Sequence, residues 1–150
     1  MVMSDRIALL RSGELEQVAA PREIYRHPAT AYVAQFIGHT NLLNCEVRSG
    51  VVRCASLSWR AALPDGPALF SLRPENIRLA GPATPPAAVF ARGQLLHQAF
   101  HGATELIRVE CPDGLVLVVR TAGGSDVPKE VEIEFCAEDA VLVRESADRN

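Results

Sequence analysis

The chain has 150 residues, of which 48% are hydrophobic, 22% are charged and 5% are aromatic, and its formal net charge is −3. This composition supports one domain, or one small domain with an appendage, and argues against a disordered chain. The slight acidity and the scattered basic residues count against non-specific binding to nucleic acid or to an anionic membrane. No stretch reaches the roughly 20 apolar residues of a membrane span.

The first 40 residues predict a β-hairpin followed by two short helices. Residues 7–10 are an unbroken apolar run, typical of a strand covered on both faces, and Ser12-Gly13 marks a turn into a second strand at 15–19. Pro21 stands where a first helical residue belongs. A second helix should end at Gly38 and bury one face, made of Tyr32, Val33, Phe36 and Ile37. A strand buried on both faces normally belongs to a large α/β domain.

After residue 41 the hydrophobic period changes from helical to two, which predicts short strands. The expected strands are 43–47, 51–61 and 68–73. The last of them should be broken at Pro74, because proline has no amide hydrogen to donate. Residues 80–88 contain three prolines and are expected to form an internal linker.

The second half of the chain also predicts strands. Residues 89–99 should form a long strand, and Phe100-His101-Gly102 a kink or tight bend in which Gly102 supplies the permissive backbone. Residues 112–114 should close a hairpin, and 141–143 a last strand. Residues 130–135 alternate strictly, so Val131, Ile133 and Phe135 are expected in the core and Glu130, Glu132 and Glu134 in solvent. The region from 41 onward therefore predicts a mainly β fold, a small barrel or sandwich.

The first half of the chain carries a set of motif residues: Asp5-Arg6-Ile7, Gly13, Gln17, Pro21, Glu23-Ile24-Tyr25, Phe36-Ile37-Gly38 and Asn41, with Arg73-Pro74-Glu75 further on. Together they resemble the end of the ATPase domain in the ATP-binding subunits of ATP-binding-cassette (ABC) importers of the sugar, polyamine, sulfate and ferric-iron type, in which Arg-Pro-Glu is an internal hallmark. The resemblance implies that residues 1–40 are the end of the α/β ATPase domain. It also implies that residues 41–150 are a TOBE region with an OB-like (TOBE/MOP-like) barrel fold, possibly divided into sub-lobes at 80–88. On this reading Met1 is a fragment boundary.

The resemblance also implies a function. The G-x-x-x-x-G-K-[ST] loop that cradles phosphates is absent from the sequence, so this chain is not expected to hydrolyse ATP or to need a cofactor. ATP and Mg²⁺ would bind the missing domain. The expected role is an accessory, regulatory and dimerisation domain that forms a homodimer and works with membrane permease subunits at the cytoplasmic face of the membrane. The alternative is a sensor of a small ligand, such as an oxyanion or the transported substrate.

The residues expected near functional surfaces are Arg73, Pro74, Glu75, Phe100, His101 and Gly102. An arginine offers a planar fork to carboxylates or oxyanions. The simpler alternative, which we favour, is a strand end fixed by Pro74, with Arg73 and Glu75 in local pairs. The sensor hypothesis would draw its donors from Arg73, Ser56, Ser58, Ser71 and Thr104. Tyr25, Tyr32 and Phe36 are expected to be core or domain-contact residues rather than a stacking platform.

Two further patterns are interpreted without a ligand. His97, His101 and Glu105 are spaced by four, but residues four apart on a strand are separated by about 13 Å, so they are not expected to share a metal. Cysteines 45, 54, 111 and 136 include no C-x-x-C pair and are expected to be buried free thiols.

The hairpin at residues 6–19 raises one more alternative. If it lacks the sheet on which it should pack, its apolar faces and exposed edge should seek another copy of the chain. An exchanged or edge-paired dimer through this hairpin is therefore a second possible route to association.

Overall fold

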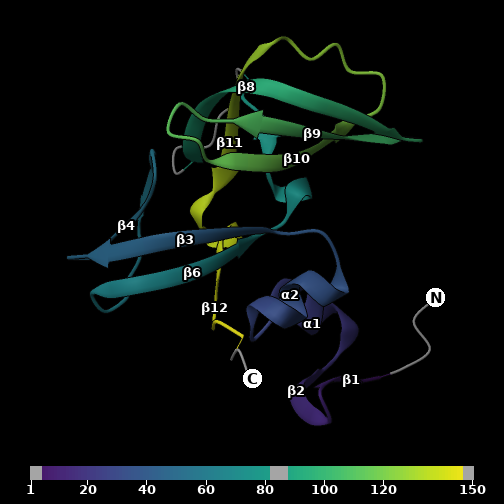
Figure 1. Cartoon of the computed structure of the whole chain (residues 1–150), viewed down its shortest axis with the longest axis vertical. Coiled ribbons are helices and arrows are strands. Elements are labelled where there is room, and N and C mark those ends of the chain that lie inside the picture. Colours follow the sequence, from purple (N-terminus) through teal and green to yellow (C-terminus); the bar gives the residue numbers. More distant parts are fainter. Residues whose placement is uncertain (1–4, 82–87, 147–150) are drawn as a thin grey trace.

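The computed structural model describes residues 5–81 and 88–146 (Figure 1). Within these ranges the chain forms a two-stranded hairpin, two α-helices and two five-stranded antiparallel sheets. The hairpin and helices lie at one end, the first sheet in the middle and the second sheet at the other end (Figure 1). The prediction of a mainly β chain is confirmed. None of the helices in the described ranges has the length and apolar character needed to cross a membrane.

The N-terminal segment has the predicted elements. Strands β1 (Ile7–Arg11) and β2 (Glu14–Ala19) pair in the hairpin, and helices α1 (Pro21–Arg26) and α2 (Ala31–Ile37) follow. Thr30 caps α2, because its hydroxyl oxygen accepts a hydrogen bond from the Val33 N–H at 3.3 Å. Leu9, Ile24 and Val33 form a small core of their own, separate from the main one.

The predicted buried face of α2 is wrong at Phe36, whose exposed fraction is 63%. The helix buries Ala31, Val33 and Ala34 instead. The two aromatic side chains pack on each other, with the ring centroids of Tyr32 and Phe36 5.8 Å apart, and the Arg11 guanidinium lies over the Tyr32 ring. Two aromatic side chains four residues apart on a helix can therefore pack against each other at the surface, without entering a core.

The first sheet has the strand order β12-β6-β3-β4-β5. Its strands are β3 (Asn41–Arg48), β4 (Val51–Cys54), β5 (Leu57–Arg60), β6 (Gly66–Leu72) and β12 (Val141–Val143). The single strand predicted over 51–61 is wrong, because the chain turns at Ala55-Ser56 and returns as β5. Ala55 adopts a left-handed backbone with φ 53°. Of the two turn residues, only Ser56 is of a type common in turns, so the sequence signal for this turn was weak.

The second sheet has the strand order β10-β9-β8-β11-β7. Its strands are β7 (Arg78–Leu79), β8 (Ala88–His101), β9 (Thr104–Glu110), β10 (Val116–Ala122) and β11 (Glu130–Cys136). Two 3-10 turns, Pro74–Asn76 and Ala137–Asp139, carry the chain out of the first sheet and back into it. Of the linker predicted at 80–88, residues 82–87 lie outside the described residues.

A shared core lies between the two sheets. Trp59 of the first sheet packs edge-on against Phe70 and against Phe135 of the second sheet, with ring centroids 5.3 and 6.0 Å apart. Val131, Ile133 and Phe135 are buried as predicted. The prediction that Glu134 is solvated is wrong. This residue is 2% exposed because it lies opposite Arg78 of the edge strand β7, whose Nε donates to its carboxylate at 2.8 Å.

Candidate functional site

Arg73 lies at the junction between the helices and the first sheet, and it is 5% exposed. Its Nη1 donates to the carbonyl oxygens of Ala34, Gly38 and His39 at 2.8, 3.2 and 3.0 Å, and its Nη2 donates to that of Tyr25 at 3.2 Å. The guanidinium also stacks on the Tyr25 ring, 4.3 Å from its centroid. Burial lowers the pKa of Arg73, yet an arginine remains charged in proteins.

The partners of Arg73 lie at or near the carboxyl ends of α1 and α2, where backbone carbonyls lack helical partners and the helix dipole is negative. One buried cation therefore ties both helices to the end of β6. The expectation of local pairs for Arg73 is wrong, because its partners are 34 to 48 residues away in sequence. These bonds occupy Nη1, whereas Nη2 makes one bond and the buried Nε has no hydrogen-bond partner.

Pro74 and Glu75 complete this junction. Pro74 is buried and begins the 3-10 turn that ends the first sheet, as its fixed backbone suggested. The Glu75 carboxylate accepts a hydrogen bond from the Tyr25 hydroxyl and lies 3.7 Å from Nη1 of Arg120 on β10. Glu75 thus connects the helical segment to the second sheet.

Asn41 connects the two sheets directly and was missed as a functional candidate. Its amide nitrogen donates to the carbonyl oxygens of Leu72 and Val118 at 3.2 and 2.9 Å, and its amide oxygen accepts from the Val118 N–H at 2.8 Å. Val118 belongs to the edge strand β10, so the side chain supplies the donor and acceptor that a neighbouring strand would offer. The signal in the sequence was the place of Asn41 as the last residue of the Phe36-Ile37-Gly38-x-x-Asn41 motif.

Phe100, His101 and Gly102 lie at the far end of the second sheet. Phe100 and His101 continue β8, and the turn follows at Gly102-Ala103, where Gly102 has φ +68°. The predicted bend is therefore confirmed at Gly102, and the two residues before it are strand. Phe100 is 70% exposed. The motif residues Arg73 to Glu75 and this hairpin end belong to different parts of the molecule, and the fold does not bring them into one site.

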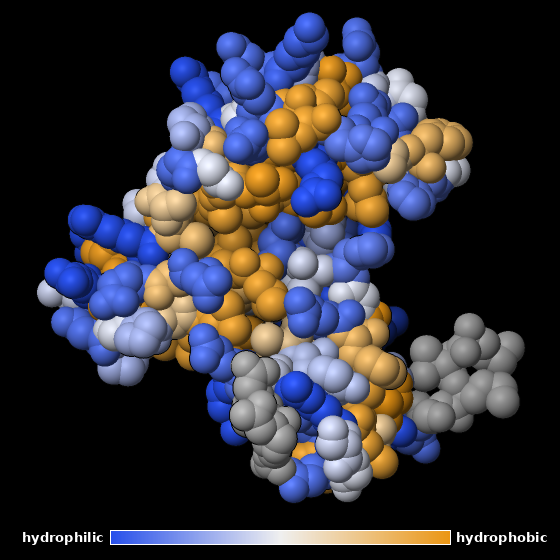
Figure 2. Space-filling model, viewed as in Figure 1, coloured by the Kyte–Doolittle hydropathy of each residue, from blue (hydrophilic) through white to orange (hydrophobic). Residues whose placement is uncertain are grey.

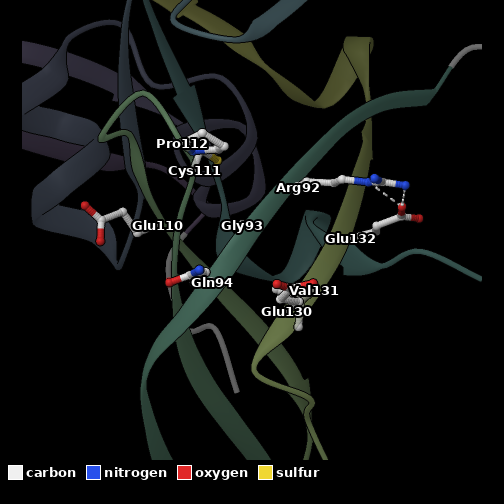
Figure 3. A pocket seen from close by; sticks show the side chains of 9 residues that line it. All are labelled: Arg92, Gly93, Gln94, Glu110, Cys111, Pro112, Glu130, Val131 and Glu132. Carbon is white, nitrogen blue, oxygen red and sulfur yellow. Dashed lines mark hydrogen bonds and ion pairs between the residues drawn. The ribbon is translucent and has the colours of Figure 1, made fainter.

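An open groove of about 670 Å³ lies beside β8, β9 and β11 (Figure 3). Its charged side chains are Glu110, Glu130, Glu132 and Arg92, and Arg92 is already paired with Glu132. Figure 3 shows the Arg92 and Glu132 side chains meeting at one side of the groove, with Glu110 at the other. This surplus of carboxylates disfavours an anionic ligand here.

The remaining candidates do not assemble into a ligand site. Ser71 on β6 pairs with Thr40, and two strands separate β6 from β5, which carries Ser58; Thr104 belongs to the second sheet. The Glu105 carboxylate is buried and bonds to Gln98 and to the Gly124 N–H, so it does not face His97 or His101 as a ligand. In the described part of the chain, no three His, Cys, Asp or Glu residues are placed to hold a metal ion.

Hydrophobic side chains reach the surface at the waist between the sheets, on the second sheet and in the hairpin. Figure 2 shows them at the waist between the sheets and across the second sheet, bordered by polar side chains. The exposed large apolar residues of the second sheet are Phe90, Leu96 and Phe100, all on β8. In the hairpin, Leu10 and Leu15 are each 59% exposed.

Comparison with known proteins places this geometry in a family. Residues 70–143 match the family model of the TOBE domain, which has an OB-like, barrel-type fold. The match begins in β6 and ends in β12, so it covers the second sheet, the Arg73 to Glu75 turn and part of the first sheet.

The chain is also similar to ATP-binding subunits of importers. The sn-glycerol-3-phosphate import ATP-binding protein UgpC of Rhizobium meliloti (strain 1021) is 35% identical over 139 residues, which are 91% of this chain and 39% of that protein. UgpC 3 of Agrobacterium fabrum (strain C58) is 36% identical over 85% of this chain and 37% of its own length. The Fe(3+) ions import ATP-binding protein FbpC of Brucella abortus (strain 2308) is 29% identical over 90% and 39%. The chain thus spans about two fifths of the length of these curated relatives.

Proposed function

Since this chain belongs to the TOBE-containing ATP-binding subunits of ABC importers, we propose that its β region is the module through which two such subunits pair. In the whole protein, ATP and Mg²⁺ would bind the ATPase domain, of which residues 1–40 would be only the end. Membrane permease subunits would hold the assembly at the inner face of the cell membrane. The β region would contribute association rather than chemistry.

The observation that carries this proposal is the unpaired end of β8. This 14-residue strand pairs with β11 over Ala88–Gln94 and with β9 over Gln94–His101. The Leu95 N–H still donates to the Lys129 carbonyl oxygen at 2.8 Å. In the described ranges, the register beyond Leu95 continues with β9 alone.

This open edge lacks charged protection against pairing, although the register of β8 with β9 shifts between Leu95 and His97. Between Arg92 and Glu105 the sequence contains no Lys, Arg, Asp or Glu, whereas exposed edge strands are commonly guarded by charged residues or proline. Leu96 and Phe100 on this edge are 53% and 70% exposed. Two copies of such an edge can pair antiparallel about a two-fold axis, which gives a self-complementary contact.

Solution mass tests the proposal. Light scattering over a dilution series should find a dimer for the full chain, and the double substitution Leu96→Lys with Phe100→Lys should shift it to monomer, because two like charges would meet at the paired edge. Leu142→Lys, at a comparably exposed residue of β12, is the matched control and should leave the dimer intact.

A second double variant separates this contact from association through the hairpin. Leu10→Lys with Leu15→Lys places charges on β1 and β2 and should not change the mass. If this variant becomes monomeric while the β8 variant remains a dimer, the hairpin is responsible and the proposed role of β8 is wrong. A monomer for the unsubstituted chain at high concentration would also contradict the proposal.

A further inference from the structure

Two cysteines face each other across adjacent strands of the first sheet. Strands β3 and β4 pair with the register Glu46 to Arg53 and Val47 to Val52. Extending this register by one residue places Cys45 opposite Cys54. Both side chains belong to the main core, with exposed fractions of 8% and 3%, and both are free thiols.

This placement fits the geometry of a disulfide. Residues directly opposite in an antiparallel pair have Cα atoms about 4.5 or 5.5 Å apart, depending on the hydrogen-bonding position. Disulfide-linked cysteines usually have Cα separations between roughly 4.4 and 6.8 Å. A bond between these two sulfur atoms therefore needs little movement of the backbone.

The two thiols also interact with each other. The contact between the two thiols raises the pKa of Cys45 and lowers that of Cys54, and the Cys45 thiol also donates to the Leu43 carbonyl oxygen at 3.5 Å. Cys54 is thus the better nucleophile of the pair, because the thiolate is the reactive form. It is also the last residue of β4, directly before the exposed turn Ala55-Ser56.

The other two cysteines lie outside this register, although Cys111 is close enough to Cys54 for the two to interact electrostatically. Cys111 follows β9 and Cys136 ends β11, so neither lies opposite a cysteine in the register of a described strand. Burial raises the pKa of the Cys111 thiol, which disfavours its reaction. Cys45 and Cys54 are therefore the pair that the fold selects.

We propose that Cys45 and Cys54 are a redox site that closes to a cross-strand disulfide on reaction with hydrogen peroxide. The Cys54 thiolate attacks one peroxide oxygen, the O–O bond breaks, and hydroxide leaves to give a sulfenic acid. The Cys45 sulfur then attacks the Cys54 sulfur, the S–O bond breaks, and the oxygen departs as water with a proton. In sum, two thiols are oxidised to one disulfide and one peroxide is reduced to two waters.

The test is peptide mapping of the folded full chain after treatment with hydrogen peroxide and alkylation of the remaining thiols. The expected result is that two of the four thiols are lost and that dithiothreitol restores them. Trypsin cleaves after Arg48 and Arg53, so the new bond should join the peptides 27–48 and 54–60. The oxidised form should also unfold at a higher temperature, because the bond restricts the unfolded chain.

Matched variants distinguish this site from general oxidation. Cys111→Ser with Cys136→Ser should retain the cross-link, and Cys45→Ser should stop at a sulfenic acid on Cys54 that dimedone traps. Oxidation of the urea-unfolded chain should give mixed linkages, since the fold no longer selects a pair. Four titratable thiols after treatment of the folded chain, or a cross-link through Cys111 or Cys136, would overturn the proposal.

Discussion

At the scale of single residues, Arg73 shows how one buried cation can organise a junction. The guanidinium is placed where two short helices end, and each of its terminal nitrogens bonds to carbonyl oxygens that the helices leave unpaired. The Tyr25 ring covers one of its faces. Removing the charge would leave several buried carbonyls without donors, which costs more than losing an ordinary surface contact.

We therefore predict that Arg73→Met lowers the free energy of unfolding by about 3 kcal/mol, since hydrogen bonds to a charged group are lost and their acceptors remain buried. Urea denaturation followed by tryptophan fluorescence measures this change through Trp59. Arg92→Met is the matched control. Its side chain is 82% exposed in an ion pair with Glu132, so a change of at most about 0.5 kcal/mol is expected. Equal losses in the two variants would show that Arg73 has no special role.

At the scale of elements, β8 and β9 approach each other closely at Gly93. A Cβ atom at this position would lie 2.5 Å from Cγ1 of Val109 and 2.6 Å from the carbonyl oxygen of Glu110. The second of these atoms is backbone, so it cannot move away by a change of rotamer. The glycine is needed here for space, and the two strands could not keep this contact with any side chain between them.

Gly93→Ala should accordingly destabilise the protein by about 1–3 kcal/mol, because the strand must shift to accept one methyl group. Thermal unfolding by circular dichroism would detect the change. Gly81→Ala serves as control, since a Cβ there meets no atom within 4 Å, and it should stay close to the unsubstituted protein. A neutral Gly93→Ala would mean that β8 and β9 separate at this point in solution.

At the scale of the whole molecule, Asn41 joins the two sheets. Its carboxamide bonds to both backbone groups of Val118 while it also bonds to Leu72 of its own sheet. The hydrophobic core between the sheets is not directional, whereas these bonds fix how β10 lies against β3. The asparagine thereby sets the relative position of the sheets.

The prediction is that Asn41→Ala reduces the free energy of unfolding by about 2–3 kcal/mol. The Val118 amide should also exchange its hydrogen faster, because the Asn41 oxygen that accepts its hydrogen bond is lost. Exchange measured by NMR would resolve that single amide. Asn44→Ala, on the exposed face of the same strand, should change stability by no more than about 0.5 kcal/mol. If Val118 exchange is unchanged in Asn41→Ala, the side chain does not hold the sheets together.

The elements that local patterns specify were predictable from the sequence. The period of two in residues 43–47 gave the buried face of β3, Pro21 marked the start of α1, and Gly102 marked a turn with φ +68°. Each depends on neighbours in the chain and on backbone sterics, so each can be read locally. The motif from Asp5 to Asn41 and the Arg73-Pro74-Glu75 triplet likewise indicated the family before any coordinates.

Only the tertiary structure decided how distant residues meet. Glu134 continues a regular alternation, yet it is buried because Arg78, 56 residues away, supplies its partner. Arg73 was expected to pair with residues nearby in the sequence, but it binds the carboxyl ends of two helices. Cys45 and Cys54 are equally far in sequence from the Ser49-Gly50 turn, and they lie opposite each other only because that turn fixes the register of β3 and β4. Whether a side chain is buried, and which residue it pairs with, depends on contacts between segments that are far apart in the sequence. The free energy of those contacts comes from packing between segments, so no single segment reveals it.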